Sequence, residues 1–421
     1  MHGPGIRGRD TRPEPPARLL DLTRLVSRAG RGPWTGIDRV EAAYLDHLLA
    51  RPVPLWALVR IAGGNVLLDP DGVKALAARL AGTARWGAID LESRIRRRGA
   101  PARARAEADL RRLAHARAGD RALAAMLARH LPAGTHAFNV GHANLREAGL
   151  GALAAVPGLS LSVMIHDTIP LDHPEFCREG MAAVMRARLD ATARHADRII
   201  CVSADTAARL ARHLAGAPCP PVTVAHPGIT PAAPDAAALP PGLPPDGPYF
   251  VTVGTIEPRK NHALLLDLWE GLSATFGPEA PRLIIAGTRG WRNEDVFARL
   301  DARPAGVIEI AGLSDAALSA LVAGSRGLLF PSLAEGYGMP PVEARALGVP
   351  AVVADLSVYR ESLGAAAIYA SPAAPYAWRA IIEALLRNEK RFERPDPPRL
   401  PTWQAHFAAV LDGIETSAGQ P

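Results

Sequence analysis

Two glutamates flank a glycine- and proline-rich turn in the second half of the chain. Residues 335–343 read EGYGMPPVE, so seven residues separate Glu335 from Glu343. An apolar segment precedes this stretch, and its paired prolines suit the first positions of a helix, where a missing N–H costs nothing. We expect Glu335 in a loop at the carboxyl end of a strand and Glu343 in the first turn of the following helix. Two carboxylates placed in this way can bind two polyol ends of one ligand.

The residues between these glutamates suit close contact with a ligand. Gly336 and Gly338 let the backbone approach a bound molecule. The N–H groups of Tyr337, Gly338 and Met339 can donate to hydroxyls or phosphates at the start of a helix. The alternative is a purely structural one, in which Glu343 complements the helix dipole and Glu335 is solvated.

A second loop carries two adjacent cations. Residues 254–261 read GTIEPRKN, so Gly254 ends the apolar strand YFVTVG, Thr255 begins the loop after it, and Arg259 and Lys260 precede a helix. A guanidinium, an ammonium and free helix amides together predict a phosphate or diphosphate site. Only three of the 48 basic residues are lysines, which singles out Lys260. The alternative is a pair of solvated bases.

Together these motifs resemble the donor site of retaining glycosyltransferases of family 4, which have the GT-B fold. The resemblance extends over residues 249–363 and includes VGTIEPRKN, LIIAG, the segment 310–332 and EGYGMPPVEARALGVPAV. It implies that Arg259 and Lys260 bind the donor diphosphate and that Glu343 binds the ribose hydroxyls. It also implies that Glu335 contacts the transferred sugar and that the backbone near Leu313 faces the nucleobase.

The first half resembles the same family more weakly. IHDTIP at 165–170 is similar to a segment of members that assemble bacterial polysaccharides. His166 ends an expected strand, so its imidazole can reach the cleft and hydrogen-bond the donor sugar; the alternative is a core histidine or a cap. Asp167 can orient this imidazole, contact the acceptor or cap a turn. Further candidates for the cleft lie in TGID at 35–38 and NVGH at 139–142, namely Thr35, Gly36, Gly141 and His142.

The elements that must position these residues alternate along the chain. Apolar strands followed by helices of about ten residues predict βαβ units and parallel sheets. A segment with eight prolines in 22 residues, 227–248, separates two such regions. We therefore expect an α/β protein of GT-B type with two doubly wound, Rossmann-like domains facing a cleft: an acceptor-side domain at 1–230, a linker at 231–247, a donor domain at 248–400 and, at 401–421, a helix crossing back to the first domain.

The expected elements can be placed by residue range. In the first half, the apolar pattern predicts strands at 19–26, 54–61, 136–140, 159–166, 198–202 and 222–225, and a helix at 37–50. The stretch 101–130, rich in alanine and arginine, predicts one or two surface helices. In the second half, strands are expected at 249–254, 282–287, 307–312, 327–332 and 350–355, and helices at 261–276, 294–300, 315–323, 341–347 and 403–414.

Charge and composition restrict the partners. Residues 1–242 carry 32 Lys+Arg and 22 Asp+Glu, whereas residues 243–421 carry 16 and 20. A solvated helix face explains the basic excess most simply, and an anionic membrane surface is the specific alternative. No aromatic-interleaved basic motif predicts nucleic-acid binding. The three cysteines and the scattered histidines match no metal-binding motif, so no metal or other cofactor is expected.

The expected activity is transfer of a sugar, with mannose suggested by the resemblance, from a nucleotide-diphosphate donor to a glycan or lipid-linked acceptor. The resemblance implies retention of anomeric configuration without a metal ion, in cell-surface polysaccharide or lipopolysaccharide synthesis. Residues 1–18 lack an apolar signal segment, which favours a cytoplasmic protein, and the basic first half allows peripheral association with the inner face of the membrane. The alternatives are a nucleotide-sugar 2-epimerase of the same fold and a non-catalytic protein that binds nucleotide sugars.

Overall fold

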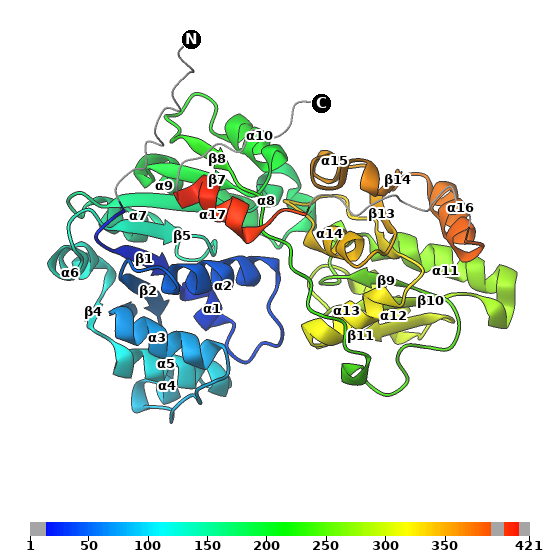
Figure 1. Ribbon diagram of the computed structural model, residues 1–421, viewed down its shortest axis with the longest axis horizontal. Helices are drawn as coiled ribbons and strands as arrows, with labels where there is room; N and C mark the ends of the chain where they lie inside the picture. The colour runs from blue at the N-terminus through cyan, green and yellow to red at the C-terminus, as the bar shows by residue number, and fades with distance from the viewer. Residues whose placement is uncertain (1–13, 389–399, 412–421) are drawn as a thin grey trace, which may run out of the picture.

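Two β-sheets form the framework of the protein, and they lie side by side in Figure 1. The computed structural model describes residues 14–388 and 400–411. The first sheet has the strand order β4-β3-β2-β1-β5-β6-β7-β8, and the second has the order β11-β10-β9-β12-β13-β14. The first strand of each domain lies inside its sheet, and later strands are added outward on both sides of it, so the doubly wound arrangement predicted from the alternating pattern is confirmed.

The first sheet combines six parallel strands with an antiparallel edge. Its strands are β1 (Arg18–Asp21), β2 (Leu55–Ile61), β3 (Gly64–Leu68), β4 (Ala116–Ala118), β5 (His136–Asn139), β6 (Ser160–Ile165), β7 (Arg198–Cys201) and β8 (Val222–Val224). Strand β3 pairs antiparallel with β2, and β4 pairs antiparallel with β3. Neither β3 nor β4 was predicted, because their short apolar runs are embedded in glycine- and alanine-rich segments.

Helices of the first domain connect these strands. They are α1 (Thr23–Ser27), α2 (Gly36–Leu49), α3 (Pro70–Leu80), α4 (Leu91–Arg96), α5 (Pro101–Leu113), α6 (Leu123–His130), α7 (Glu147–Ala154), α8 (Ile169–Asp172), α9 (Met181–His195) and α10 (Ala204–His213). The helix expected at 37–50 is confirmed as α2, which begins with a capping box between Thr35 and Asp38.

Two expectations for the first domain are wrong. The strand expected at 19–26 ends at Asp21, whose carboxylate accepts from the Thr23 N–H at 2.9 Å and starts α1. The apolar residues Leu25 and Val26 are then buried by a helix rather than by a strand. The second error concerns α5, which is not a solvated surface helix, because a run from Ala106 to Leu110 is buried against the domain.

The second sheet is entirely parallel. Its strands are β9 (Tyr249–Val253), β10 (Arg282–Ala286), β11 (Val307–Ile310), β12 (Leu328–Phe330), β13 (Ala351–Ala354) and β14 (Ile368–Ala370). The helices between and after them are α11 (His262–Phe276), α12 (Glu294–Asp301), α13 (Asp315–Ala323), α14 (Met339–Ala346), α15 (Ser357–Leu363) and α16 (Pro375–Leu386). The regular alternation predicted from the sequence is confirmed throughout this domain.

The proline-rich segment does not run free between the domains. It includes a 3-10 turn at Ala236–Ala238, and the Asp235 N–H donates to the Ala316 carbonyl of α13 at 3.1 Å. The final described helix, α17 (Trp403–Leu411), returns to the first domain as expected (Figure 1). There the Arg198 guanidinium donates to the Val410 carbonyl, and Tyr44 bonds His406. Residues 412–414 of the predicted helix lie outside the described residues.

Buried side chains connect the two domains. One hydrophobic cluster includes Leu20 and Phe138 of the first sheet and continues through Tyr337 and Met339 to Val251 and Phe330 of the second. Burial of this cluster removes apolar surface of both domains from water. The carboxyl ends of the strands that carry the candidate residues therefore meet across a packed interface rather than across open solvent.

Candidate functional site

The two predicted loops of the second domain meet at one buried ion cluster. Arg259 and Lys260 lie in a 3-10 turn, Pro258–Lys260, after β9, and Glu335 lies in the loop after β12. The Arg259 Nη1 is 2.7 Å from Glu335 Oε1, and the Lys260 Nζ donates to the same oxygen. Arg259 also donates to the backbone carbonyl of Ala334 at 3.0 Å. Residues 75 positions apart in sequence are thus joined by direct contacts.

A further carboxylate, Glu257, completes this cluster and was not predicted. The Arg259 Nε is 2.6 Å from Glu257 Oε1, while Glu257 Oε2 is buried without a hydrogen-bond partner. Two cations therefore face two carboxylates. The signal in the sequence was the position of Glu257 within IEPRK, three residues before Lys260, but a glutamate in a loop is ordinarily solvated.

Burial and the neighbouring charges together shift the pKa values of the residues in this cluster. Burial alone would raise the pKa of Glu335, but Arg259 and Lys260 outweigh it and lower this pKa to about 2. Burial lowers the pKa of Lys260, although Glu335 opposes the change. Burial also raises the pKa of Glu257. The Lys260 ammonium additionally lies 4.2 Å from the centre of the Phe330 ring. The cations are held in fixed positions at the end of the sheet.

Close backbone packing fixes these loops. Gly254 has a φ of +136°, a conformation that favours glycine. Its carbonyl oxygen would be 1.8 Å from a Cβ at position 287, so only glycine fits at position 287. Thr255 follows it, and its methyl group lies over Gly290. Asn261 starts α11 with a φ of +54°, but its side chain makes no cap hydrogen bond and instead reaches the Pro331 carbonyl.

The two glycines after Glu335 lie in close packing, and one of them contacts the first domain. A Cβ at Gly336 would lie 2.0 Å from the His166 carbonyl oxygen, and the Gly336 carbonyl accepts from the Ser203 hydroxyl at 2.8 Å. Gly338 has a φ of +83° and packs against the Tyr359 ring. Tyr337 and Met339 are buried. Gly336 thus permits a close approach to the opposite domain, whereas Gly338 permits close packing within its own domain.

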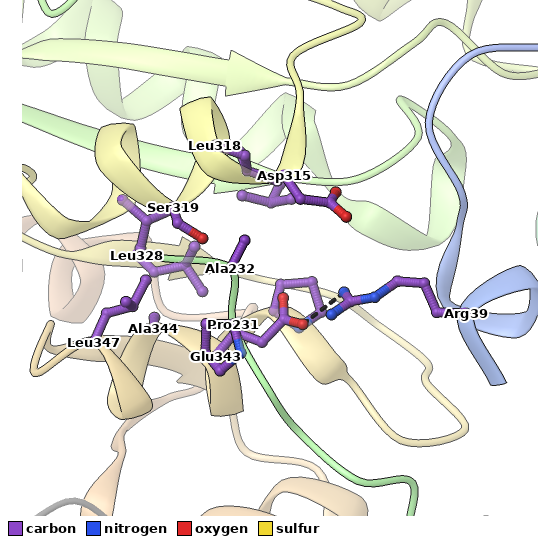
Figure 2. A pocket seen from close by; sticks show the side chains of 13 residues that line it. Arg39, Pro231, Ala232, Asp315, Leu318, Ser319, Leu328, Glu343, Ala344 and Leu347 are labelled. Carbon is purple, nitrogen blue, oxygen red and sulfur yellow. Dashed lines mark ion pairs between the residues drawn. The ribbon is translucent and has the colours of Figure 1, made fainter. Parts of the chain in front are cut away.

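Glu343 lies deeper in its helix than expected. Helix α14 begins at Met339 after the left-handed Gly338, so Glu343 falls beyond the first turn and the expectation of a first-turn carboxylate is wrong. Its carboxylate is 2.6 Å from the Arg39 guanidinium of α2, in the first domain. Figure 2 shows these two side chains pointing toward each other.

The pair borders a pocket at the interface (Figure 2). Its walls come from α2, α13, α14, the strands β9 and β12 and the start of the linker, and include Arg39, Pro231, Asp315, Ser319, Leu328 and Glu343. Asp315 and Leu318 line the pocket. Leu313, whose backbone was expected near the nucleobase, instead packs against the hydrophobic cluster that connects the domains. The Glu343 carboxylate of α14 thus forms part of the wall of this pocket.

His166 and His142 form a buried pair at the ends of β6 and β5. The His142 Nε2 accepts from the His166 backbone N–H at 3.0 Å, and the His166 Nε2 lies 2.7 Å from the Val140 carbonyl. Because a carbonyl only accepts, the His166 Nε2 carries the proton and is not free for a sugar hydroxyl. Burial lowers the pKa of His166 to about 4 and also lowers that of His142, so both rings are neutral.

Three further first-domain candidates are Asp167 and two closely packed glycines, Gly141 and Gly36. The Asp167 carboxylate accepts from the Ile169 N–H at 3.1 Å and so caps the turn into α8, one of its expected roles. Burial raises the pKa of Asp167, and the nearby charge of Arg259 opposes this. A Cβ at Gly141 would lie 2.0 Å from a Glu41 oxygen. A Cβ at Gly36 would meet the Met339 sulfur at 3.3 Å.

The structure thus gathers most predicted residues at one interface. Arg259, Lys260 and Glu335 touch directly, Gly336 packs on His166 and Asp167, and Gly36 packs on Met339. Thr35 instead caps α2, with its hydroxyl 2.7 Å from Asp38. Arg39 was not predicted, since an arginine within an amphipathic helix carries no signal in sequence. Within residues 14–388 and 400–411, no three His, Cys, Asp or Glu side chains form a cluster suited to a metal ion.

Comparison with known proteins finds glycosyltransferase family models that match parts of both domains. Residues 239–396 match the model for glycosyl transferases group 1, and residues 83–233 match that for Glycosyltransferase Family 4. The serotype-specific mannosyltransferase WbdA of Escherichia coli is 34% identical over 230 residues, which is 50% of this chain and 28% of WbdA. The O-antigen chain mannosyltransferase B of E. coli is 32% identical over 126 residues, 30% of this chain and 33% of that one.

The chain therefore spans about a third or less of the length of these relatives. Among solved structures, Anabaena HepE in complex with UDP and glucose is similar to this chain with a TM-score of 0.59. The two share 14% sequence identity, and the alignment covers 95% of each chain. This likeness, together with the two sheets, confirms the GT-B fold.

Proposed function

On the premise that this chain is a GT-B glycosyltransferase of the family 4 type, we propose that it transfers a sugar from a nucleotide-diphosphate donor to a glycan or lipid-linked acceptor. The observation that carries the proposal is the cluster of Arg259, Lys260 and Glu335 at the carboxyl ends of β9 and β12. Ligands of doubly wound sheets bind at this edge. The cluster faces Asp167 of the first domain, so a ligand there would touch both domains.

The chemical task is to break the bond between the sugar and the diphosphate. Negative charge then develops on the departing oxygen, and Arg259 and Lys260 would stabilise it from fixed positions. These cations are held by two carboxylates, Glu335 and Glu257. A donor diphosphate would compete with Glu335 for them, which would turn that carboxylate toward hydroxyls of the transferred sugar. Glu335 is accordingly a sugar-positioning residue rather than a nucleophile.

Retention of configuration and metal independence belong to the same proposal. With no nucleophile assigned, attack of the acceptor on the same face of the sugar fits the cluster, and the departing phosphate would take the acceptor's proton. Two side-chain cations would supply the charge that a divalent ion supplies in other phosphate sites. The closed, hydrophobic interface around Tyr337 and Met339 would keep water from the donor.

We propose mannose as the sugar and cell-surface polysaccharide as the product, because WbdA and its O-antigen counterpart are named as mannosyltransferases. The nucleoside would occupy the pocket between Arg39 and Ser319, with its ribose on Glu343. A cytoplasmic site of action, next to the inner face of the membrane, suits a lipid-linked acceptor. No helix among the described residues is long and apolar enough to cross a membrane.

A donor screen tests the proposal. Release of nucleotide would be measured for GDP-mannose, UDP-glucose and other sugar nucleotides, with and without glycan acceptors. Acceptor-dependent release from one donor is expected, with GDP-mannose favoured. Conversion of the sugar without an acceptor would indicate the 2-epimerase instead, and binding of donors without any turnover would indicate a non-catalytic protein.

A further inference from the structure

Helix α4 exposes two large aliphatic side chains to solvent. Leu91 is 70% exposed and Ile95 is 63% exposed, and among the large hydrophobic residues of the described chain only Tyr376 is more exposed. Four residues apart on a helix, Leu91 and Ile95 lie on the same face. Exposure of one such residue is common, but two on one short helix form a small apolar ridge that water covers at a cost.

Unpaired arginines border this ridge. Arg94 and Arg98 are exposed, and neither makes a hydrogen bond or ion pair with any residue that the structure describes. Arg94 lies three residues from Leu91 within the helix and therefore beside it, and Arg98 follows two residues after the end of the helix. The acidic residue of the helix, Glu92, is already shared by Arg96, Arg111 and Arg117. The free charge on this face is therefore positive.

The surrounding surface has the same sign. Residues 81–117 contain ten arginines, no lysines and four acidic residues. All four of those acids are engaged by arginines of α5: Asp90 and Glu92 by Arg111, Glu107 by Arg103, and Asp109 by Arg112. Such a surface attracts anions at long range, and salt weakens the attraction.

The ridge is fixed in place rather than free to fold inward. The Asp90 carboxylate caps α4 by accepting from the Ser93 N–H at 2.8 Å, and two Arg111 nitrogens each lie 2.6 Å from the same carboxylate. Arg97, just after the helix, pairs with the buried Glu107 of α5. Helix α5 thus holds α4 with Leu91 and Ile95 outward.

This face also has a defined position relative to the interface. The start of α5 packs on the loop before α2, because a Cβ at Gly30 would overlap that of Ala102. The same loop carries Trp34, which is 38% exposed, and ends at Gly36 beside Met339. Figure 1 shows α4 and α5 together on the outer edge of the first domain, below α3.

We propose that the face formed by Leu91, Arg94, Ile95 and Arg98, called here the α4 face, docks on an anionic lipid bilayer. The guanidinium groups would contact lipid phosphates, and the two aliphatic side chains would enter the boundary between headgroups and acyl chains. Docking would place the first domain where a lipid-linked acceptor lies. This inference rests on the proposed function only for that last point.

Vesicle binding of the full chain tests the α4 face. Co-sedimentation would be measured with vesicles of phosphatidylcholine alone and of 70:30 phosphatidylcholine and phosphatidylglycerol, each at low and at physiological salt. The variants are Leu91→Gln with Ile95→Gln, and Arg94→Gln with Arg98→Gln. The matched controls are Tyr376→Gln, which removes an exposed aromatic of the second domain, and Arg121→Gln with Arg212→Gln, which removes two exposed arginines elsewhere on the first.

The wild type is expected to bind the anionic vesicles and not the neutral ones. Each α4 variant should weaken binding by about tenfold or more, since a basic residue near an anionic surface contributes roughly fivefold. The controls should bind as the wild type does. Unchanged binding by both α4 variants, or binding that ignores anionic lipid, would overturn the proposal.

Two further measurements distinguish lipid docking from a catalytic defect and from self-association. Sugar transfer to a soluble acceptor should be unchanged in the α4 variants, which would show that they fold and that the proposed function stands independently. If transfer is absent in every variant and in the wild type while docking persists, the proposed function fails and the α4 face survives. A third outcome is that the wild type self-associates, the α4 variants do not, and none of these proteins binds vesicles. That result would assign the α4 face to a second copy of the chain and overturn lipid docking.

Discussion

The guanidinium of Arg39 lies 2.6 Å from the carboxylate of Glu343 and joins the two domains at the edge of the pocket proposed to bind the nucleoside. Arg39 lies on α2 of the first domain, and Glu343 lies on α14 of the second (Figure 2). The carboxylate proposed to bind ribose is therefore oriented by a residue of the opposite domain. The pocket proposed for the nucleoside has its full lining only while the two domains are in contact.

Replacement of Arg39 is expected to weaken donor binding more than catalysis. Arg39→Ala should reduce the affinity for GDP or UDP by about tenfold, because a partly buried charge pair is lost. Titration calorimetry would measure the affinity, and kinetics would show a raised KM with a smaller change in kcat. Arg39→Lys should recover part of the affinity, and Arg121→Ala is the control. An unchanged affinity would separate Arg39 from the nucleoside site.

Removal of both cations should abolish most of the turnover. Replacement of Arg259 and Lys260 by Ala is expected to lower kcat by roughly a thousandfold or more, since a single fixed donor to a developing anion contributes about 10²–10³. The double variant also leaves Glu335 and Glu257 buried without counter-ions, so thermal unfolding must be measured in parallel. Lys260→Arg, which keeps the charge, tests geometry. Full turnover in the folded double variant would contradict the assigned role.

Glu335→Gln should separate nucleotide binding from transfer. The substitution removes the counter-ion that both cations share in the structure, so GDP or UDP binding should persist or become tighter. Transfer should fall because the carboxylate no longer positions the sugar hydroxyls. Equilibrium binding and kcat would be measured on the same preparation. Loss of nucleotide binding would instead indicate a defect of the fold.

The buried His262 predicts a pH dependence of stability. Burial lowers its pKa to about 4 in the folded protein, and its Nδ1 is buried without a partner. Below the ordinary pKa of about 6.5 the unfolded chain takes up a proton that the folded protein does not, so stability falls as pH falls from about 6.5 toward 4.

The comparison of wild type with His262→Leu isolates this contribution, because both proteins share every other titrating group. The difference in free energy of unfolding should move in favour of the variant by roughly 1.5 kcal/mol between about pH 6.5 and pH 5. Urea unfolding at several pH values measures it. If the free energy of unfolding changes with pH in the same way for both proteins, His262 is not held neutral in the folded state.

Activity is expected to persist after removal of divalent metal ions. The proposed site neutralises the diphosphate with Arg259 and Lys260, so excess chelator should leave kcat within about twofold, a change of under about 1 kcal/mol. Donor turnover would be measured with and without added EDTA, and then with Mg²⁺ restored. Loss of activity that Mg²⁺ recovers would contradict the metal-free proposal.

Much of the second domain was predictable because its signals are local. Its strands are short apolar runs, its helices have regular apolar spacing, and Pro340 and Gly338 mark the start of α14. The first domain was less predictable where local signals conflict with packing. The apolar run at 19–26 fits a strand or a helix equally well, and the carboxylate of Asp21 ends the strand.

The sequence by itself determined the two-domain α/β organisation and the types of side chain in the two loops proposed to bind the donor. Both can be read from short segments, because apolar spacing and residue type are local properties of the chain. Only the tertiary structure decided which charges meet. It placed Glu335 on both Arg259 and Lys260, added Glu257, joined Arg39 to Glu343 and committed the His166 Nε2 to a backbone carbonyl. These contacts join residues far apart in the chain, and burial at the domain interface, which no local pattern records, sets their charge and orientation.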